Sequence, residues 1–182
     1  MATDQQCIDS TRCWIENVVI AQNFCPFAHF VYVNELIEFS VNKPGSMKAA
    51  LEQLAQSLEN LQSNSSVETS LLIFPEFVSA WEDYLDFLEL AQSLLKQLGY
   101  EGIFQLASFH PDYCFEGEST DDAANYTNRS PFPMLHILRE ASLSEQIEHY
   151  PDAQQIPENN IVHARTMGAD SLRSLLKNCI KK

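Results

Sequence analysis

Residues 69–74 read Thr-Ser-Leu-Leu-Ile-Phe, and this short apolar run decides the fold of the chain. A strand with one solvent-exposed face alternates apolar and polar residues, whereas an unbroken apolar run is typical of a strand with two buried faces. Such a strand needs a neighbouring strand on each side. We therefore place residues 69–74 at the centre of a sheet.

Strand patterns recur on both sides of this run. Residues 31–41 alternate apolar and polar side chains, as a strand with one buried face does. Two further strands are predicted at residues 103–109 and 134–138. Because a helical stretch connects residues 69–74 with residues 103–109, we expect these two strands to be parallel neighbours that end at the same edge of the sheet.

Helical spacing of apolar residues fills the intervals between the predicted strands. Thr3 with Gln6 forms a capping box at the start of the first helix, and Ser79 with Glu82 forms another before residues 84–98. The first of these helices ends before a proline at position 26.

The tail of the chain, residues 158–180, also has helical spacing, with Gly168 as an expected break. No repeat or linker divides the sequence. It therefore predicts a single α/β domain over residues 1–182, with a mixed sheet of about four strands covered mainly on one face by helices.

Charge and composition exclude several classes of function. The 182 residues include 25 acidic and 11 basic side chains, a formal charge of -14 that repels nucleic acids and anionic membrane surfaces. We expect neither as a partner. The N-terminus lacks a secretory signal pattern, so a cytoplasmic location is expected. No phosphate-binding loop or dinucleotide fingerprint is recognisable, and no cofactor is assigned.

Candidate functional residues gather in the irregular segment 110–139, which follows a predicted strand. A loop of this length is typically functional or disordered, and its aromatic residues argue against disorder. Ligands of open α/β sheets bind beyond the carboxyl ends of the strands, where this segment begins. The candidates in it are His110, Asp112, Glu116, Asn128, Arg129, His136 and Arg139.

His110 is the candidate acid or base of this segment. Asp112 and Glu116 could orient its imidazole, and His136 or Arg129 could converge on it if the loop folds back over the sheet. The alternative is a hydrogen-bonded residue at the rim of the sheet. A metal site built from the two histidines and Asp112 matches no known ligand spacing, so no metal is assigned.

Arg129 is the candidate anion-binding residue, flanked by Asn128. A planar guanidinium grips a carboxylate or phosphate by two parallel hydrogen bonds, and a loop arginine is unusual in so acidic a chain. The alternative is an ion pair with Asp121, Asp122 or Glu118 that only holds the loop closed. The main functional hypothesis is a pocket, formed by residues 110–139, that binds or transforms a small anionic metabolite.

Two other functions stay open. Cys25, followed by a proline, could serve a single-thiol redox protein, although a thiol at the end of a helix gains nothing from the helix dipole. The chain could instead be a non-catalytic interaction module that binds a partner protein on the sheet face around Tyr32, Leu36 and Ser40. The sequence does not indicate an oligomeric state.

Several motifs together resemble a known bacterial family. They are Trp14-x-x-x-Val-Val leading to Cys25-Pro-Phe, Phe109-His-Pro-x-Tyr with Phe115, and Asn128-Arg-Ser-Pro-Phe-Pro-Met-Leu-His-Ile-Leu-Arg139. The family is catalogued as domain of unknown function 1415. The resemblance covers nearly the whole chain and implies a small bacterial protein of about this length. It brings no assigned reaction, ligand or catalytic residue.

Overall fold

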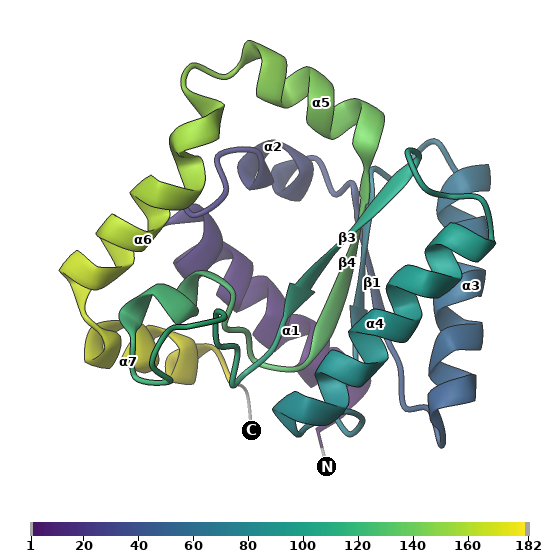
Figure 1. Cartoon of the computed structure of the whole chain (residues 1–182), viewed down its shortest axis with the longest axis horizontal. Coiled ribbons are helices and arrows are strands. Elements are labelled where there is room, and N and C mark those ends of the chain that lie inside the picture. The colour runs from purple at the N-terminus through teal and green to yellow at the C-terminus, as the bar shows by residue number, and fades with distance from the viewer. Residues whose placement is uncertain (1, 181–182) are drawn as a thin grey trace.

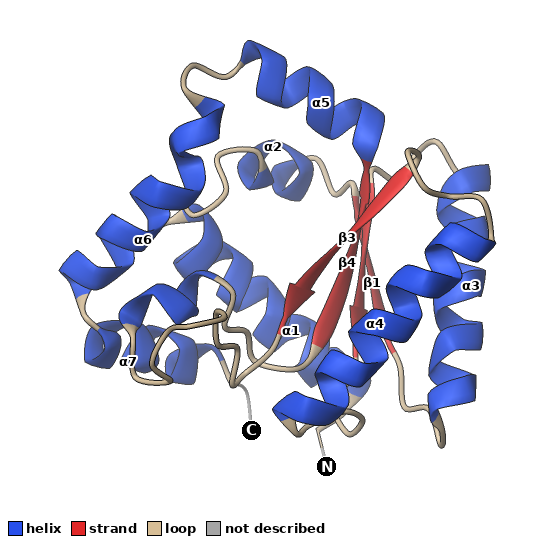
Figure 2. Cartoon of the chain, in the orientation of Figure 1, coloured by secondary structure: helices blue, strands red, loops and turns tan. Residues whose placement is uncertain are grey.

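One mixed four-stranded sheet lies at the centre of the protein, and helices pack on both sides of it (Figures 1 and 2). The structure is a computed structural model that describes residues 2–180. The α/β class and the mixed four-stranded sheet predicted from the sequence are confirmed. The strands are β1 (Ile37–Val41), β2 (Thr69–Ile73), β3 (Phe104–Phe109) and β4 (Met134–Arg139).

The strand order is β1-β2-β4-β3. β2 is central, as its apolar run predicts, and all five of its residues are buried. β2 and β3 are not the neighbours that the sequence suggested, because β4 inserts between them and pairs antiparallel with both. The two strands nevertheless run in the same direction, so Ile73 and Phe109 end opposite the same residue, Met134.

Helices cover both faces of the sheet, whereas the sequence predicted cover mainly on one. α3 (Met47–Ser63) and α4 (Trp81–Gln97) pack on one face around Leu54, Phe87 and Leu135. The opposite face is covered by helices from the two ends of the chain, with a second core around Trp14, Met134 and Leu172. These are α1 (Asp4–Trp14), η1 (Ile15–Ile20), α2 (Ala28–Val33), α6 (Ile156–Met167) and α7 (Ala169–Cys179).

The chain also contains a helix that the sequence did not suggest, α5 (Glu140–His149), followed by the short turn η3 (Ala153–Gln155). α5 leaves the end of β4 and passes above α2 in Figure 1. None of its residues is buried. It therefore bridges the sheet and the C-terminal helices without joining either core.

The predicted strand over residues 31–41 is wrong in its first half. Residues up to Val33 belong to α2, and only Ile37–Val41 form a strand. Glu35 adopts φ 56°, a left-handed turn that separates the two elements. Alternation over so few residues does not distinguish a strand from one helical turn followed by a strand.

Helix ends follow the sequence in part. The capping box of Thr3 and Gln6 is present, and Gly168 separates α6 from α7 with φ +83°. The capping box expected at Ser79 is absent, because α4 begins one residue later with Ala80 as its N-cap and no side-chain cap. Glu82 and Asp83, in the first turn of α4, instead place negative charge at the positive end of the helix dipole.

Helix α1 continues without interruption into η1, a π-helical turn. In this turn the backbone N–H of Ala21 donates to the carbonyl of Glu16 at 3.0 Å, and that of Phe24 donates to Val19 at 2.9 Å. Each bond spans five residues instead of the four of an α-helix. Ile15 and Val19, four positions apart on this turn, both line the cavity against the sheet.

Tyr84 joins α4 to the edge of the sheet where β3 ends and β4 begins. Its hydroxyl donates to the carbonyl of Met134 at 2.7 Å and accepts from the backbone N–H of Phe109 at 3.2 Å. The side chain is fully buried, which raises the pKa of its phenol far above the ordinary value. Water cannot replace these bonds.

Replacement of Tyr84 by Phe should therefore lower the free energy of unfolding by about 2 kcal/mol, because two buried backbone groups lose their partner. Urea denaturation at constant slope measures the change. Tyr100→Phe is the matched control, since the Tyr100 ring packs against Phe104 and its hydroxyl makes no hydrogen bond within residues 2–180. Equal stability of the two variants would contradict the bridging role.

Candidate functional site

A cavity of about 240 Å³ lies on the face of the sheet that α1 and η1 cover. Its lining is almost entirely apolar. The sheet contributes Ala107 and Phe109 from β3 and Leu71 from β2, and α5 contributes Leu143. The remaining wall comes from the end of α1, from η1, from α2 and the segment before it, and from β1 and β4. The cavity is therefore bordered by side chains from many parts of the chain and not by residues 110–139 alone.

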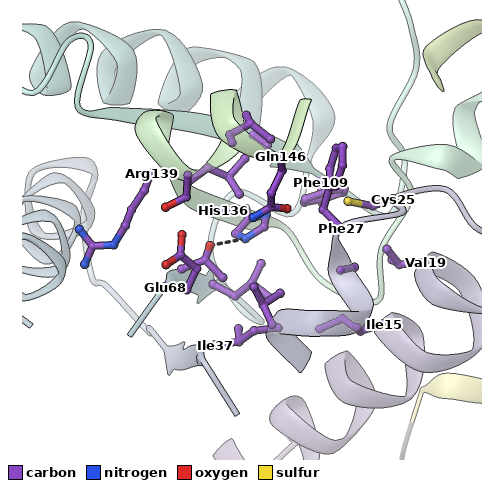
Figure 3. A pocket seen from close by; sticks show the side chains of 18 of the residues that line it. Ile15, Val19, Cys25, Phe27, Ile37, Glu68, Phe109, His136, Arg139 and Gln146 are labelled. Atoms are coloured by element: carbon purple, nitrogen blue, oxygen red, sulfur yellow. Dashed lines mark hydrogen bonds between the residues drawn. The ribbon is translucent and has the colours of Figure 1, made fainter. Parts of the chain in front are cut away.

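His136 is the polar group on the sheet side of this cavity. It lies on β4, paired with Ala107 on one side and Leu71 on the other, so its ring projects into the space left by the small alanine. Phe109 packs beside it, with ring centroids 6.3 Å apart. Figure 3 shows the ring between Glu68 and Cys25, with Gln146 reaching towards it from α5.

Hydrogen bonds fix the tautomer of His136. Thr69 Oγ1 lies 2.5 Å from His136 Nε2 and 2.6 Å from the carbonyl oxygen of Ile137. A hydroxyl has one proton, and the carbonyl can only accept, so the Thr69 proton goes to Ile137. Nε2–H must then donate to Thr69. The neutral ring thus carries its proton on Nε2 and a lone pair on Nδ1.

Nδ1 of His136 is open to the cavity. It has no hydrogen-bond partner within residues 2–180, and Gln53 Oε1 is the one described side-chain atom that is both unpaired and sealed from solvent. Burial lowers the pKa of His136 to about 4. The imidazole is therefore neutral at neutral pH, and it presents one hydrogen-bond acceptor in an apolar wall.

Cys25 borders the same cavity on the side of η1 and α2. Burial raises the pKa of its thiol, although backbone N–H groups of Phe27 and Ala28 partly favour the thiolate. The residue is therefore a protonated thiol at neutral pH. Its contribution to the site is a small, weakly polar surface.

Arg139 borders the cavity with its stem, but its guanidinium points away (Figure 3). Its Nη2 donates to the carbonyls of Leu61 at 2.6 Å, Asn64 at 3.0 Å and Val67 at 3.0 Å. These groups lie at and beyond the C-terminal end of α3, where helical carbonyls lack partners. Arg139 therefore caps that helix, and no other arginine or lysine is among the described residues that line the cavity.

His110 lies on the opposite face of the sheet from His136. It is fully buried against the rings of Trp81 and Tyr84, with centroids 5.2 and 5.0 Å away. Nε2 lies 3.2 Å from the carbonyl of Val78, and Nδ1 accepts from the backbone N–H of Asp112 at 3.0 Å. Both nitrogens are occupied, and burial lowers the pKa of the ring.

The bonds of His110 support a strained turn. Val78 adopts φ 49°, which is unfavourable for a β-branched residue, and its carbonyl receives the imidazole N–H. Asp112 contributes its backbone to this arrangement, while its side chain and that of Glu116 are exposed. The expected group of acids around the imidazole is not assembled.

Arg129 closes the 110–139 segment through backbone carbonyls. Its Nε donates to Tyr113 at 3.1 Å, its Nη2 donates to Thr120 at 2.8 Å, and its guanidinium lies 4.7 Å from the centroid of Tyr126. The amide of Asn128 donates to the carbonyl of Ser108 at 3.3 Å. Both candidates for anion binding are thus engaged in holding the segment.

The ion pair considered for Arg129 is made by another residue. Arg165, on α6, lies 2.9 Å from Asp122 and 3.1 Å from Glu118, and the Arg165 guanidinium lowers the pKa of Asp122. Trp14 Nε1 also donates to the carbonyl of Arg129 at 2.9 Å. The segment therefore packs against the rest of the protein, and neither His110 nor Arg129 is among the residues that line the cavity.

Within residues 2–180, no three metal-ligating side chains converge on one point. No helix of the same range has the combination of length and apolar character that crossing a bilayer requires.

Thr69, Ala107 and Gln146 were not candidates from the sequence. The available signal for His136 was its position as the one polar residue in the apolar run Met134–Leu138. Its partner Thr69 stands 67 positions earlier, and nothing in the local sequence joins them. Gln146 lies on α5, which the sequence did not predict because its apolar pattern is weak.

The family of the chain follows from its sequence as a whole. A family model described as "Protein of unknown function (DUF1415)" matches residues 6–174. The chain belongs to this family. The match includes every residue that lines the cavity, from Trp14 to Gln146. No curated protein and no solved structure matches the chain.

Acid should destabilise the protein partly through His136. An unfolded imidazole has a pKa of about 6.5, and the folded value is about 4, so the unfolded chain binds the proton more readily between these limits. The free energy of unfolding should therefore fall as the pH drops through this window, with up to about 3 kcal/mol from this residue.

His136→Gln tests the assignment, because the amide of glutamine keeps a donor for Thr69 and does not titrate. Urea unfolding at several pH values should show a smaller loss of stability in this variant than in the natural protein. His149→Gln is the control, since His149 is exposed on α5. Identical pH profiles for His136→Gln and the natural protein would contradict the shifted pKa.

Proposed function

We propose that the protein binds a small, largely apolar molecule that carries a hydrogen-bond donor, such as a hydroxyl group, at one end. One observation carries this proposal: a largely apolar cavity is bordered by an unpaired acceptor, Nδ1 of His136, with its tautomer fixed by Thr69. Ligand sites in proteins typically combine an apolar lining with a few oriented polar groups.

The size of the cavity limits the ligand. Its volume of about 240 Å³ is below the range of roughly 300–1,000 Å³ that is usual for drug-sized ligands. A short aliphatic chain or a single ring fits this volume. The ligand's apolar part would contact Leu71, Phe109 and Leu143, and its donor would face His136.

The charge of the site favours a neutral or cationic ligand over the anionic metabolite expected from the sequence. The guanidinium of Arg139 points away and is bonded to three carbonyls. Glu68 borders the same end of the cavity and adds negative charge. A carboxylate placed there would face this acid and the lone pair of Nδ1, without a cation to offset its desolvation.

Binding is better supported than proton-transfer chemistry. An efficient general base has a pKa near the working pH, whereas the pKa of His136 is about 4. The raised pKa of Cys25 likewise gives little support to a thiolate nucleophile or to the single-thiol redox hypothesis. Of the surface expected for the interaction module, Ser40 lies on the sheet in β1, whereas Tyr32 lies on α2.

Octanol and octanoate form a matched pair of probes, because they share an alkyl chain and differ in the polar end. Octanol should bind with a dissociation constant on the order of 0.1–1 mM, as measured by calorimetry. Octanoate should bind at least about 10-fold more weakly, since burying an unpaired carboxylate is costly. Tighter binding of octanoate would overturn the assigned ligand class.

The location of binding is tested with Ala107→Leu, which places additional methyl groups in the cavity opposite His136. Octanol binding should be lost, while the melting temperature stays equal or rises, because the added groups fill empty apolar space. Ala80→Leu is the control, since Ala80 is exposed at the start of α4 on the other face. Retained octanol affinity in Ala107→Leu would place the binding elsewhere.

A further inference from the structure

Two cysteines meet where the first and last helices of the protein pack together. Cys13 lies near the end of α1 and Cys179 is the last residue of α7. Their sulfur atoms are 2.9 Å apart, although 166 positions separate them in the sequence. Both are present as thiols. This distance is about 0.9 Å longer than a disulfide bond, which a small rotation of the side chains removes.

The two sulfurs differ in their access to solvent. Cys13 is partly exposed, and Asn17 Nδ2 lies 3.4 Å from its sulfur on the solvent side. Cys179 is 1% exposed. An external reagent therefore reaches Cys13 first, and Cys179 is positioned behind it. A solvent-accessible thiol with a second thiol in contact is the arrangement of a redox-sensitive pair.

The other cysteines lie in different surroundings. Cys25 borders the cavity, and the sulfur of Cys114 lies 3.5 Å from the carbonyl of Glu118. Cys7 is fully buried in the core, and burial raises the pKa of its thiol. The contact between Cys13 and Cys179 is thus a specific feature of the α1–α7 junction.

We propose that Cys13 and Cys179 form a reversible disulfide that fastens α7 to α1 when the protein meets a low-molecular-weight disulfide. The thiolate of Cys13 attacks one sulfur of that oxidant, forms a mixed disulfide and expels one thiolate. The thiolate of Cys179 then attacks the sulfur of Cys13 and expels the second. Two protein thiols lose two electrons and two protons, and one small disulfide becomes two thiols.

The bond would close most of the chain into a loop. A cross-link between residues so far apart removes conformational freedom from the unfolded chain, which stabilises the folded state. Its position also matters for the candidate site, because Cys13 immediately precedes Trp14, which lines the cavity and donates to Arg129. Oxidation would therefore stiffen one wall of the cavity. This inference does not depend on the ligand proposed above.

Oxidised glutathione is the probe. The fully reduced, full-length protein is incubated with it, and the remaining thiols are blocked before mass spectrometry. We expect two fewer blocked cysteines than in the reduced protein, a peptide pair joined through Cys13 and Cys179 after digestion without reductant, and a melting temperature higher by roughly 10 °C. Dithiothreitol should reverse all three changes.

Cys13→Ser and Cys179→Ser should each abolish the cross-link and the thermal shift, and Cys179→Ser should accumulate glutathione on Cys13. Cys114→Ser is the matched control and should behave like the natural protein. A lasting mixed disulfide on Cys13 in the natural protein, unreacted thiols, or a cross-link between other cysteines would overturn the proposal. Peptide mapping of the natural protein tests the proposed disulfide even if a variant does not fold.

Discussion

β4 pairs with β2 over Met134–Leu138 on one side and with β3 over its whole length on the other, and this double pairing is the constraint on which the rest of the structure depends. Because its backbone groups are committed on both sides, alternate side chains must enter opposite cores. Leu135 and Ile137 pack against α3 and α4, while Met134 and His136 face α1. A shift of one residue would exchange the two sets.

The candidate site arises from this register together with one small residue. Ala107 is the β3 partner of His136, and a larger side chain there would occupy the space that the imidazole now borders. α5 passes over that space without burying any of its own residues. The cavity therefore results from incomplete packing between a rigid sheet and a helix that the core does not hold. The imidazole tolerates an unpaired nitrogen because that atom is accessible.

The sequence predicted local features of this fold better than long-range ones. The apolar run of β2, the Thr3 cap and the break at Gly168 depend on neighbouring residues, and all three are confirmed. The expected pairing of residues 69–74 with residues 103–109 was wrong, because periodicity reports which side chains face inward and not which strand lies alongside. The strand predicted at residues 31–33 was wrong, because a left-handed turn at Glu35 divides an apparently continuous alternation.

The same limit applies to the site. Residue types in the 110–139 segment suggested chemistry, but their hydrogen-bond partners could not be read from the sequence. Arg129 and Arg139 both bind backbone carbonyls, which every residue carries and no motif marks. His136 was among the candidates, yet its role depends on Thr69, which reaches it only through the pairing of β2 with β4.

The π-helical turn η1 has a consequence for how the family can vary in length. One residue more or fewer between Trp14 and Phe24 would rotate everything beyond the turn by about 100° around the helix axis. Either Trp14 would leave Phe109, its ring neighbour at 5.1 Å, or Val19 would turn outward. Packing therefore fixes the number of residues between Trp14 and Phe24. Insertions and deletions among relatives should be found in surface loops instead.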